Sequence, residues 1–376
     1  MINKERLFKT FHDLAEISSP SRKEEAVSLY IARRLSGLNI ETKSDNTEKI
    51  TGANTGNLIV RIKGNGGAGQ SVMFNAHMDT IEPTEQLKVI EDDKTIKTSG
   101  NSILGADDKA GIAVILEMIE VIKEKDIEHL PIEIIFTVSE EIGLFGANAL
   151  DYPKINSKLA FCFDGGGKAG EAVMQAPTQE IIDVNFKGKA VHAGVEPEEG
   201  INAIYAACKA AADFPQGRLD EETTANLGTI EGGKATNIVA EKANFSAEVR
   251  SHNPEKLEKT IVKIEESAKK AASKTSAKVD IERKISFVGF RLEKDEEVTI
   301  IAKSAMAELG IEPVYTISGG GSDSNVFNSK GIKTLTLSMG ARKAHSKEEY
   351  IEKEEFVKSA ELALKIVDVA TKRVKS

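Results

Sequence analysis

The sequence predicts an α/β protein with a mostly parallel sheet flanked by helices, interrupted by an inserted α+β domain of the ferredoxin-like type. Three observations lead to this prediction. The chain has 376 residues, more than one hydrophobic core usually organises, so about two domains are expected. In the outer parts of the chain, continuous apolar runs of strand length alternate with helical patterns, which is typical of parallel strands buried on both faces. Between them, residues 177–290 follow the order strand, helix, strand, strand, helix, strand.

The N-terminal part of the chain opens with helical apolar spacing at residues 4–17 and 22–36. Ser21, followed three residues later by Glu24, forms a capping-box pattern at the start of the second helix. The apolar runs NLIVRIKG and SVMFNAHMD predict two strands, and a helix is expected over residues 109–123. The runs IEIIFTVSEE and KLAFCFDGG predict two more strands, which completes the first half of the sheet.

The pattern changes after about residue 177. The runs EIIDVNFKGKAV, NLGTIEGG, NIVAEKANFSAEVRS and KVDIERKISF predict strands, while INAIYAACKAAADF and PEKLEKTIVKIEESAKKAASK predict helices. The outer pattern resumes with a helix near 296–309, the strand KTLTLSMGA and a C-terminal helix near 353–374. We therefore expect a catalytic domain made of residues 1–176 and 291–376, and an inserted lid domain made of residues 177–290.

Composition excludes several classes of partner. The formal net charge of -9, from 50 basic and 59 acidic residues, argues against nucleic acid or an anionic membrane. The N-terminal MINKERLFKTFHDLAEI lacks the apolar core of a signal peptide, and Glu117 and Glu120 interrupt the run AVILEMIEVI, so no membrane segment is expected. Cys162 and Cys208 both lie in apolar settings and are predicted to be buried free thiols. A reducing cytoplasm is the expected location.

Acidic and histidine residues follow the predicted strands in a fixed order. They are His77-Met78-Asp79, Asp107-Asp108-Lys109, Glu140-Glu141, Asp164-Gly165-Gly166 and His345. Each motif alone is more simply a helix cap, a turn or a solvated strand end. Open α/β sheets, however, place their sites at the carboxyl ends of the strands, and carboxylates with imidazoles are ligands for divalent metals. The five motifs together therefore predict a metal site.

Together with several glycine-rich segments, these motifs resemble those of the dinuclear zinc peptidases, the superfamily of peptidase T, carboxypeptidase G and the aminoacylases. The resemblance is closest to the peptidase T family and covers nearly the whole chain. It rests on AHMDT (76–80), GADDKAG (105–111), EEIGLFGA (140–147), DGG (164–166), HAG (192–194), GGGSDSN (319–325) and His345. Two segments depart from the family pattern: GGGSDSN stands for GGTDG, and His345-Ser346-Lys347 for His-Gly-Lys.

The resemblance implies a role for each residue of the metal site. Asp107 should bridge two metals, with His77 and Asp164 completing one site. Glu141 and His345 should complete the other. Asp79, two residues from His77 on the same strand, should orient that histidine, and Glu140 should act as general base. The family often has a cis peptide bond after the bridging aspartate, which here is the bond between Asp107 and Asp108.

The resemblance also implies substrate-binding groups in the lid. His192 should stabilise the tetrahedral oxyanion, and Arg250 should bind a substrate carboxylate through two parallel hydrogen bonds. Asn237 and Gly320 should shape the same pocket.

The expected function is that of a metal-dependent aminopeptidase that removes the N-terminal residue of short peptides. Two divalent metal ions are expected as cofactors, with zinc as the family default and cobalt or manganese as alternatives. The expected partners are a short peptide substrate and a second copy of the chain, bound through the lid domain. An N-acyl amino acid deacylase or a carboxypeptidase of the same superfamily is the alternative, and a non-catalytic binding protein is a more distant one.

Overall fold

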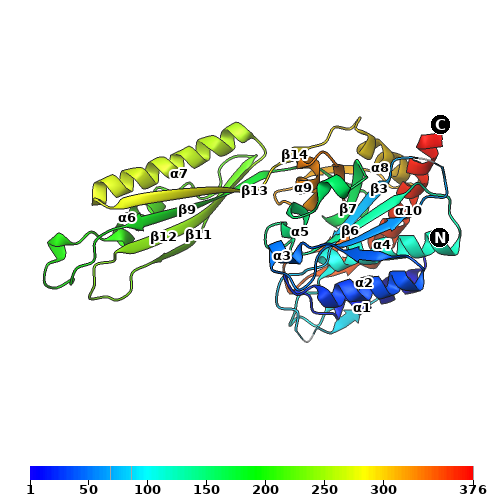
Figure 1. Ribbon diagram of the computed structural model, residues 1–376, viewed down its shortest axis with the longest axis horizontal. Coiled ribbons are helices and arrows are strands. Elements are labelled where there is room, and N and C mark those ends of the chain that lie inside the picture. Colours follow the sequence, from blue (N-terminus) through cyan, green and yellow to red (C-terminus); the bar gives the residue numbers. More distant parts are fainter. Residues whose placement is uncertain (68, 86, 376) are drawn as a thin grey trace. The chain divides into compact units, whose positions relative to one another are not determined.

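A computed structural model describes residues 1–376 except residues 68, 86 and 376. The chain forms two compact units (Figure 1). The first contains Met1–Gln175, Arg291–Ser318 and Ser322–Ser376, and the second contains Ala176–Phe290 and Gly319–Gly321. The sequence analysis had placed residue 176 and residues 319–321 in the first unit. None of the described helices combines the length and the apolar composition that a membrane span requires.

The first unit is built on a large mixed sheet with the strand order β1-β2-β6-β3-β7-β16-β17-β5-β4. These strands are β1 Thr42–Ser44, β2 Leu58–Ile62, β3 Val72–His77, β4 Val89–Glu91, β5 Thr95–Thr98, β6 Ile132–Thr137, β7 Leu159–Gly166, β16 Lys333–Arg342 and β17 Tyr350–Glu352. Three further strands branch from this path: β8 Glu171–Ala176, β14 Phe290–Arg291 and β15 Val314–Ile317. The central strands β6, β3, β7 and β16 are mutually parallel, so their carboxyl ends lie at one edge.

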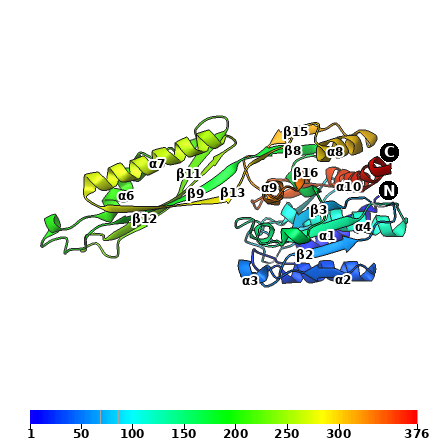
Figure 2. The same cartoon turned by 45° about the horizontal axis from the view of Figure 1, so that its top comes forward.

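Helices cover this sheet. They are α1 Lys4–Ala15, α2 Glu25–Gly37, α3 Glu48–Thr51, α4 Ala106–Glu124, α5 Phe145–Asn148, α8 Glu297–Glu308, α9 Asp323–Ser329 and α10 Lys353–Lys375. Helices α4 and α10 lie side by side against the central strands, and α1 packs on α4 (Figure 2). Every residue of β3 and β6 is buried, as expected for strands covered on both faces.

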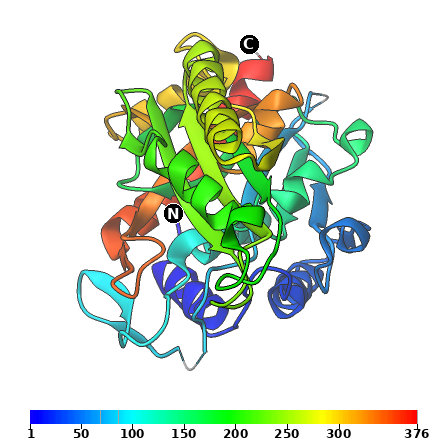
Figure 3. The same ribbon diagram turned by 90° about the vertical axis from the view of Figure 1, so that its left-hand side faces the viewer.

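The second unit is a five-stranded antiparallel sheet with the order β10-β11-β12-β9-β13. Its strands are β9 Thr178–Lys187, β10 Gly217–Arg218, β11 Thr223–Gly232, β12 Lys242–Ser251 and β13 Lys278–Phe287. Helices α6 Ala203–Ala212 and α7 Pro254–Thr275 lie side by side on one face (Figure 3). The chain order is that of the predicted ferredoxin-like unit, so the predicted fold class is confirmed. Strand β12 begins at Lys242, later than the run at 237 suggested.

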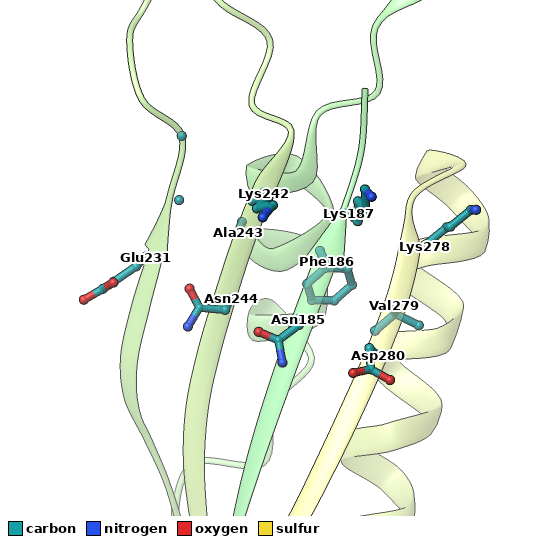
Figure 4. Close-up of a pocket in the computed structure, with 12 residues that line it drawn as sticks. Asn185, Phe186, Lys187, Glu231, Lys242, Ala243, Asn244, Lys278, Val279 and Asp280 are labelled. Atoms are coloured by element: carbon teal, nitrogen blue, oxygen red, sulfur yellow. The ribbon is translucent and has the colours of Figure 1, made fainter. Parts of the chain in front are cut away.

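The two faces of the second sheet differ in chemistry. The face under the helices is apolar, with Phe186 and Phe245 fully packed in its core. The opposite face is polar. There, Lys187 is paired across the sheet with Lys242 on one side and Lys278 on the other, and the three line a hollow of about 680 Å³ (Figure 4).

Two local predictions are wrong. Helix α2 begins at Glu25, whose N–H donates to the side-chain oxygen of Asn54 at 3.0 Å. Neither Ser21 nor Glu24 caps the helix, so the predicted capping box does not form. Both side chains are engaged elsewhere, as described below. Cys162 is buried as expected, but Cys208 is exposed. The buried positions of α6 are alanines on its other face, Ala203, Ala206, Ala207 and Ala210, and this spacing leaves Cys208 on the outer face.

Candidate metal centre

The predicted metal ligands lie at the carboxyl ends of the central strands. His77 is the last residue of β3, Asp164 lies near the end of β7, and Glu141 follows β6. Asp107 lies in the first turn of α4, and His345 lies between β16 and β17. Because β6, β3, β7 and β16 are parallel neighbours, the fold brings all five side chains to one edge of the sheet.

The carboxylate of Asp107 lies between two histidines. Its Oδ1 is 2.9 Å from Nε2 of His77, and its Oδ2 is 3.3 Å from Nε2 of His345. Nε2 of His77 also lies 3.7 Å from Asp164 Oδ1, and Nε2 of His345 lies 3.0 Å from the Glu141 carboxylate. One oxygen of Asp107 therefore faces His77, which also lies near Asp164, and the other faces His345, which also lies near Glu141. Glu141 in addition lies close enough to His77 and Asp107 for the three to share one ion. A carboxylate placed in this way can bridge two cations.

The neighbouring Asp108 is also close to His77 and Asp164. Its carboxylate is committed to the backbone, however: Oδ2 accepts from the N–H of His77 at 3.0 Å and Oδ1 from the N–H of Gly111 at 3.2 Å. Asp108 is fully buried, and the peptide bond between Asp107 and Asp108 is cis. Of the two aspartates, Asp107 is the one whose oxygens are turned toward both histidines.

The tautomer of His77 follows from its hydrogen bonds. Nδ1 lies 2.8 Å from the backbone carbonyl of Asp79, and a carbonyl oxygen only accepts, so Nδ1 carries the proton. This leaves Nε2, on the side of Asp107, as the nitrogen that can bind a metal. The carboxylate of Asp79 is farther from Nδ1, at 3.5 Å. The His77 ring is therefore hydrogen-bonded to the backbone carbonyl of Asp79, and orientation of the ring by the Asp79 side chain stays a prediction.

The carboxylate of Asp79 holds the turn after β6 instead. Its Oδ1 accepts from the N–H of Glu140 at 3.0 Å, and its Oδ2 accepts from the N–H of Glu141 at 3.2 Å. The hydroxyl of Ser21 also donates to Oδ2 at 2.6 Å. Asp79 itself is fully buried, and its bond to Glu140 is shielded from water. The residue thus fixes the backbone of the two glutamates that the sequence predicts as base and ligand.

The site concentrates negative charge in a buried place. Burial, together with the charge of Asp164, raises the pKa of Glu140 well above its usual range. Burial and the charge of Asp107 raise the pKa of Asp164 to about 7. Burial by itself would lower the pKa of His77, but hydrogen bonds to Asp107 and Asp164 raise it well above the usual value. Repulsion among the carboxylates would be relieved by cations, and nitrogen with oxygen donors suits zinc, cobalt or manganese.

Sequence analysis did not identify Glu349 as part of this site. Its carboxylate accepts from the N–H of Gly105 at 2.7 Å and from the N–H of Asp107 at 3.1 Å, and only 1% of the residue is exposed. In the sequence it stands in the charged run SKEEY, which is typical of a solvated loop. Its partners are backbone groups far away in the chain, so no side-chain motif could reveal it.

The predicted substrate-binding residues lie in the second unit. His192 is exposed and accepts from the N–H of Gly194 at 3.2 Å through Nδ1. The loop of Asn237 is paired with that of His192, because the Asn237 carbonyl accepts from Ala193 at 2.9 Å. Arg250 donates to both carboxylate oxygens of Glu248, at 2.9 and 3.1 Å.

Gly320 belongs to the 319–321 segment that clusters with this unit. His192, Asn237 and Arg250 have local partners within the second unit, and the roles of all four residues toward a substrate stay predictions.

Two family models match the chain. A peptidase dimerisation domain matches residues 182–276, and peptidase family M28 matches residues 57–208. Among curated proteins, the uncharacterized protein YqjE of Bacillus subtilis (strain 168) is 42% identical over 99% of this chain and 100% of its own length. Peptidase T of Clostridium botulinum (strain Loch Maree / Type A3) is 30% identical over 81% of this chain and 76% of its own length.

Two solved structures resemble the whole chain. Aminopeptidase PepT from Bacillus cereus ATCC 10987 has a TM-score of 0.88 at 40% identity and covers 98% of this chain and 99% of its own. A tripeptidase from Staphylococcus aureus subsp. aureus Mu50 has a TM-score of 0.92 at 34% identity and covers 99% of this chain and 100% of its own.

The fold, the inserted dimerisation domain and the histidine–carboxylate cluster define a dinuclear metallopeptidase of the aminopeptidase type. Within that class, the chain belongs to the peptidase T family. The resemblance inferred from the sequence motifs is thereby confirmed.

Proposed function

We propose that this protein hydrolyses the N-terminal peptide bond of unblocked tripeptides, using two divalent metal ions, most simply zinc, with cobalt or manganese as alternatives. The observation that supports this proposal best is the placement of Asp107, whose two oxygens face two different histidines. A single metal ion would use only one of these histidines. A carboxylate that lies between two histidines could instead bridge two cations.

His77, Asp107 and Asp164 would hold one ion, and Asp107, Glu141 and His345 the other. Bound there, two cations supply an acidified water and polarise the substrate carbonyl, as metal pairs do in aminopeptidases.

Glu140 is the group of this chain that would move protons. Its carboxyl is buried, and burial raises its pKa, which favours its holding a proton taken from water until the leaving amine accepts it. The backbone of Glu140 is fixed by Asp79, so the position of the carboxyl is restricted before substrate binds. Such preorganisation is what a general base requires, because a small displacement weakens proton transfer sharply.

The second unit would supply the groups that recognise the substrate. His192 is exposed and would stabilise the oxyanion of the tetrahedral intermediate. Arg250 would bind the C-terminal carboxylate of the peptide, exchanging its ion pair with Glu248 for that bond. Asn237 and Gly320 would shape the pocket. The match of residues 182–276 to a peptidase dimerisation domain supports a homodimer formed through this unit, which sedimentation analysis of the full chain would test.

The test is hydrolysis of free tripeptides by the metal-loaded protein beside the Glu140→Gln variant. We expect release of the N-terminal amino acid, a loss of roughly 10²- to 10⁴-fold in kcat for the variant, and unchanged metal content in both. Glu25→Gln, an exposed glutamate at the start of α2, is the matched control. Cleavage of N-acylated amino acids, or release of the C-terminal residue, in place of tripeptide cleavage would move the assignment to a deacylase or a carboxypeptidase.

A further inference from the structure

The loop between α1 and α2 reaches the site through Ser21. The Ser21 hydroxyl donates to Asp79 Oδ2 at 2.6 Å, and that carboxylate in turn accepts from the N–H groups of Glu140 and Glu141. A hydrogen bond to a buried charged acceptor is stronger than a neutral one and restricts the rotation of the carboxylate. Ser21 therefore acts on the two glutamates through one intermediate residue.

Glu24 gives the same loop a second contact with the turn formed by residues 139–141. Glu24 is fully buried, and its Oε1 accepts from the N–H of Ser139 at 3.0 Å and from its hydroxyl at 3.1 Å. Ser139 directly precedes Glu140 and has a φ of 54°, a left-handed conformation that a serine adopts only when its surroundings hold it there. Oε1 of Glu24 also accepts from the N–H of Arg22 at 2.7 Å, so the carboxylate joins its own loop to this turn. Oε2 is buried without a hydrogen-bond partner among the described residues.

Three consecutive backbone N–H groups of the turn thus donate to carboxylates. Those of Ser139, Glu140 and Glu141 go to Glu24 or to Asp79. Such an arrangement sets the path of the backbone more firmly than a turn exposed to water, since the bonds from Ser139 and Glu140 are buried and that from Glu141 is partly buried. The orientation of the Glu140 and Glu141 side chains follows from that path.

The loop itself is anchored to rigid elements. The carbonyl of Ser19 accepts from the N–H of Thr80 at 2.9 Å, just after β3, and Pro20 forms a parallel bridge with Thr80. The buried ammonium of Lys109, in α4, donates to the carbonyl of Ile17 at 2.6 Å. The loop is therefore held at its beginning by the strand and the helix that also present His77 and Asp107.

We propose that Ser21 and Glu24 are positioning residues that set the backbone of residues 139–141, and thereby aim the Glu140 carboxyl and the Glu141 ligand. The proposal rests on the proposed function for the roles of those two glutamates. The segment 17–24 would then contribute to the reaction by positioning other residues, although none of its own side chains is a predicted ligand or base.

The first experiment compares Ser21→Ala with Ser18→Ala in the full-length, metal-loaded protein. Ser18 lies in the same loop, but its hydroxyl pairs with Thr84 at 2.6 Å, outside the site. We expect Ser21→Ala to lower kcat about 10-fold, with KM little changed, because one hydrogen bond to a charged group is lost. Ser18→Ala should keep the activity of the wild type.

The second comparison uses the two adjacent glutamates. Glu24→Ala should lower kcat by at least about 10-fold, since it leaves the Ser139 N–H and hydroxyl unpaired, while Glu25→Ala, at an exposed position, should not. Glu24→Gln retains the accepting Oε1 and should restore most of the activity. A purely structural role for Glu24 would lower thermal stability in the alanine variant without this selective effect on kcat.

Cobalt(II) titration followed by visible absorption gives a readout that is independent of activity. Ser21→Ala should weaken one of two cobalt sites about 10-fold, because only the ligand Glu141 belongs to the turn. Equal cobalt affinities in Ser21→Ala, Glu24→Ala and the wild type would overturn the proposal, and so would equal weakening of both sites. If the wild type cleaves no tripeptide, the proposed function fails, and the cobalt affinities still decide whether the loop positions the turn.

Discussion

Glu349 accepts the backbone N–H of Asp107 at 3.1 Å, although 242 residues separate the two in the chain. The same carboxylate accepts from the N–H of Gly105 at 2.7 Å. Asp107 lies at a point where the backbone of α4 is not yet helical, so its N–H is not held by the helix. Glu349 therefore fixes the turn from which the Asp107 carboxylate reaches toward both histidines.

We expect Glu349→Ala to weaken binding of both metal ions, by roughly 10- to 100-fold, because Asp107 faces His77 and His345 alike. Zinc or cobalt titration of the purified variant measures this effect. Glu348→Ala, the exposed neighbour that pairs with Lys343, should bind metal as the wild type does. Weakening of only one ion would show that Glu349 does not act through Asp107.

His345 contacts only one half of the proposed metal pair. Its Nε2 faces Asp107 and Glu141, while His77, Asp107 and Asp164 remain together without it. His345→Ala should therefore retain about one equivalent of tightly bound metal after dialysis and lose most of its peptidase activity. Elemental analysis counts the ions. Loss of both ions, or retention of both, would contradict the division of ligands proposed here.

The site residues predicted from the sequence share one property: their own side chains are of types that can bind a metal ion. His77, Asp107 and Asp164 stand at the ends of apolar runs, and a parallel sheet brings such ends to one edge, so their proximity follows from the pattern. The fold of the second unit was equally predictable from the sequence, because strands and amphipathic helices of ordinary length alternate there. Strands of only three residues, such as β4 and β17, are too short to carry a comparable signal.

The residues that were missed act on backbone groups. Glu349 and Glu24 accept N–H groups from distant turns, and such partners exist only after folding. The Ser21 and Glu24 pattern was locally consistent with a helix cap. In the folded protein, however, Ser21 bonds to Asp79 and Glu24 bonds to Ser139 instead. A pattern three residues long cannot distinguish these outcomes.

Gly111 permits the close approach of α4 to β7. A Cβ at this position would lie 2.0 Å from the carbonyl oxygen of Phe163 and 2.3 Å from Asp108 Oδ1. Phe163 directly precedes the proposed ligand Asp164, so a side chain at 111 would push the helix away from the proposed metal site. Gly111→Ala should lose at least about 1–3 kcal/mol of unfolding free energy and bind metal more weakly.

Urea unfolding and metal titration measure the two effects. Gly37→Ala, at the end of α2, is the matched control. Apart from its chain neighbours and the backbone of its own helix, no atom of the described residues lies within 4 Å of the added methyl group. It should be neutral or stabilising by up to about 1 kcal/mol. Equal stability of the two variants would show that α4 can shift without cost.

Glu24 should make the stability of the protein depend on pH. Burial, with a contribution from the charge of Asp79, raises the pKa of Glu24 above its ordinary value of 4.5. A carboxyl whose pKa is higher in the folded than in the unfolded state contributes stability that is fully present below the unfolded pKa. That contribution is lost as pH rises through the folded pKa.

Glu24→Gln removes this titration while keeping an acceptor for Ser139. Relative to the wild type, the variant should therefore gain stability as pH rises above 4.5, the ordinary pKa of a glutamate. The gain should be about 1.4 kcal/mol for each tenfold increase in the proton affinity of Glu24 on folding. Urea unfolding in the presence of a chelator measures the difference without metal binding. Glu25→Gln should show no such change, because Glu25 is exposed. A difference between Glu24→Gln and the wild type that is constant with pH would mean that Glu24 is as free to ionise in the folded protein as in the unfolded chain.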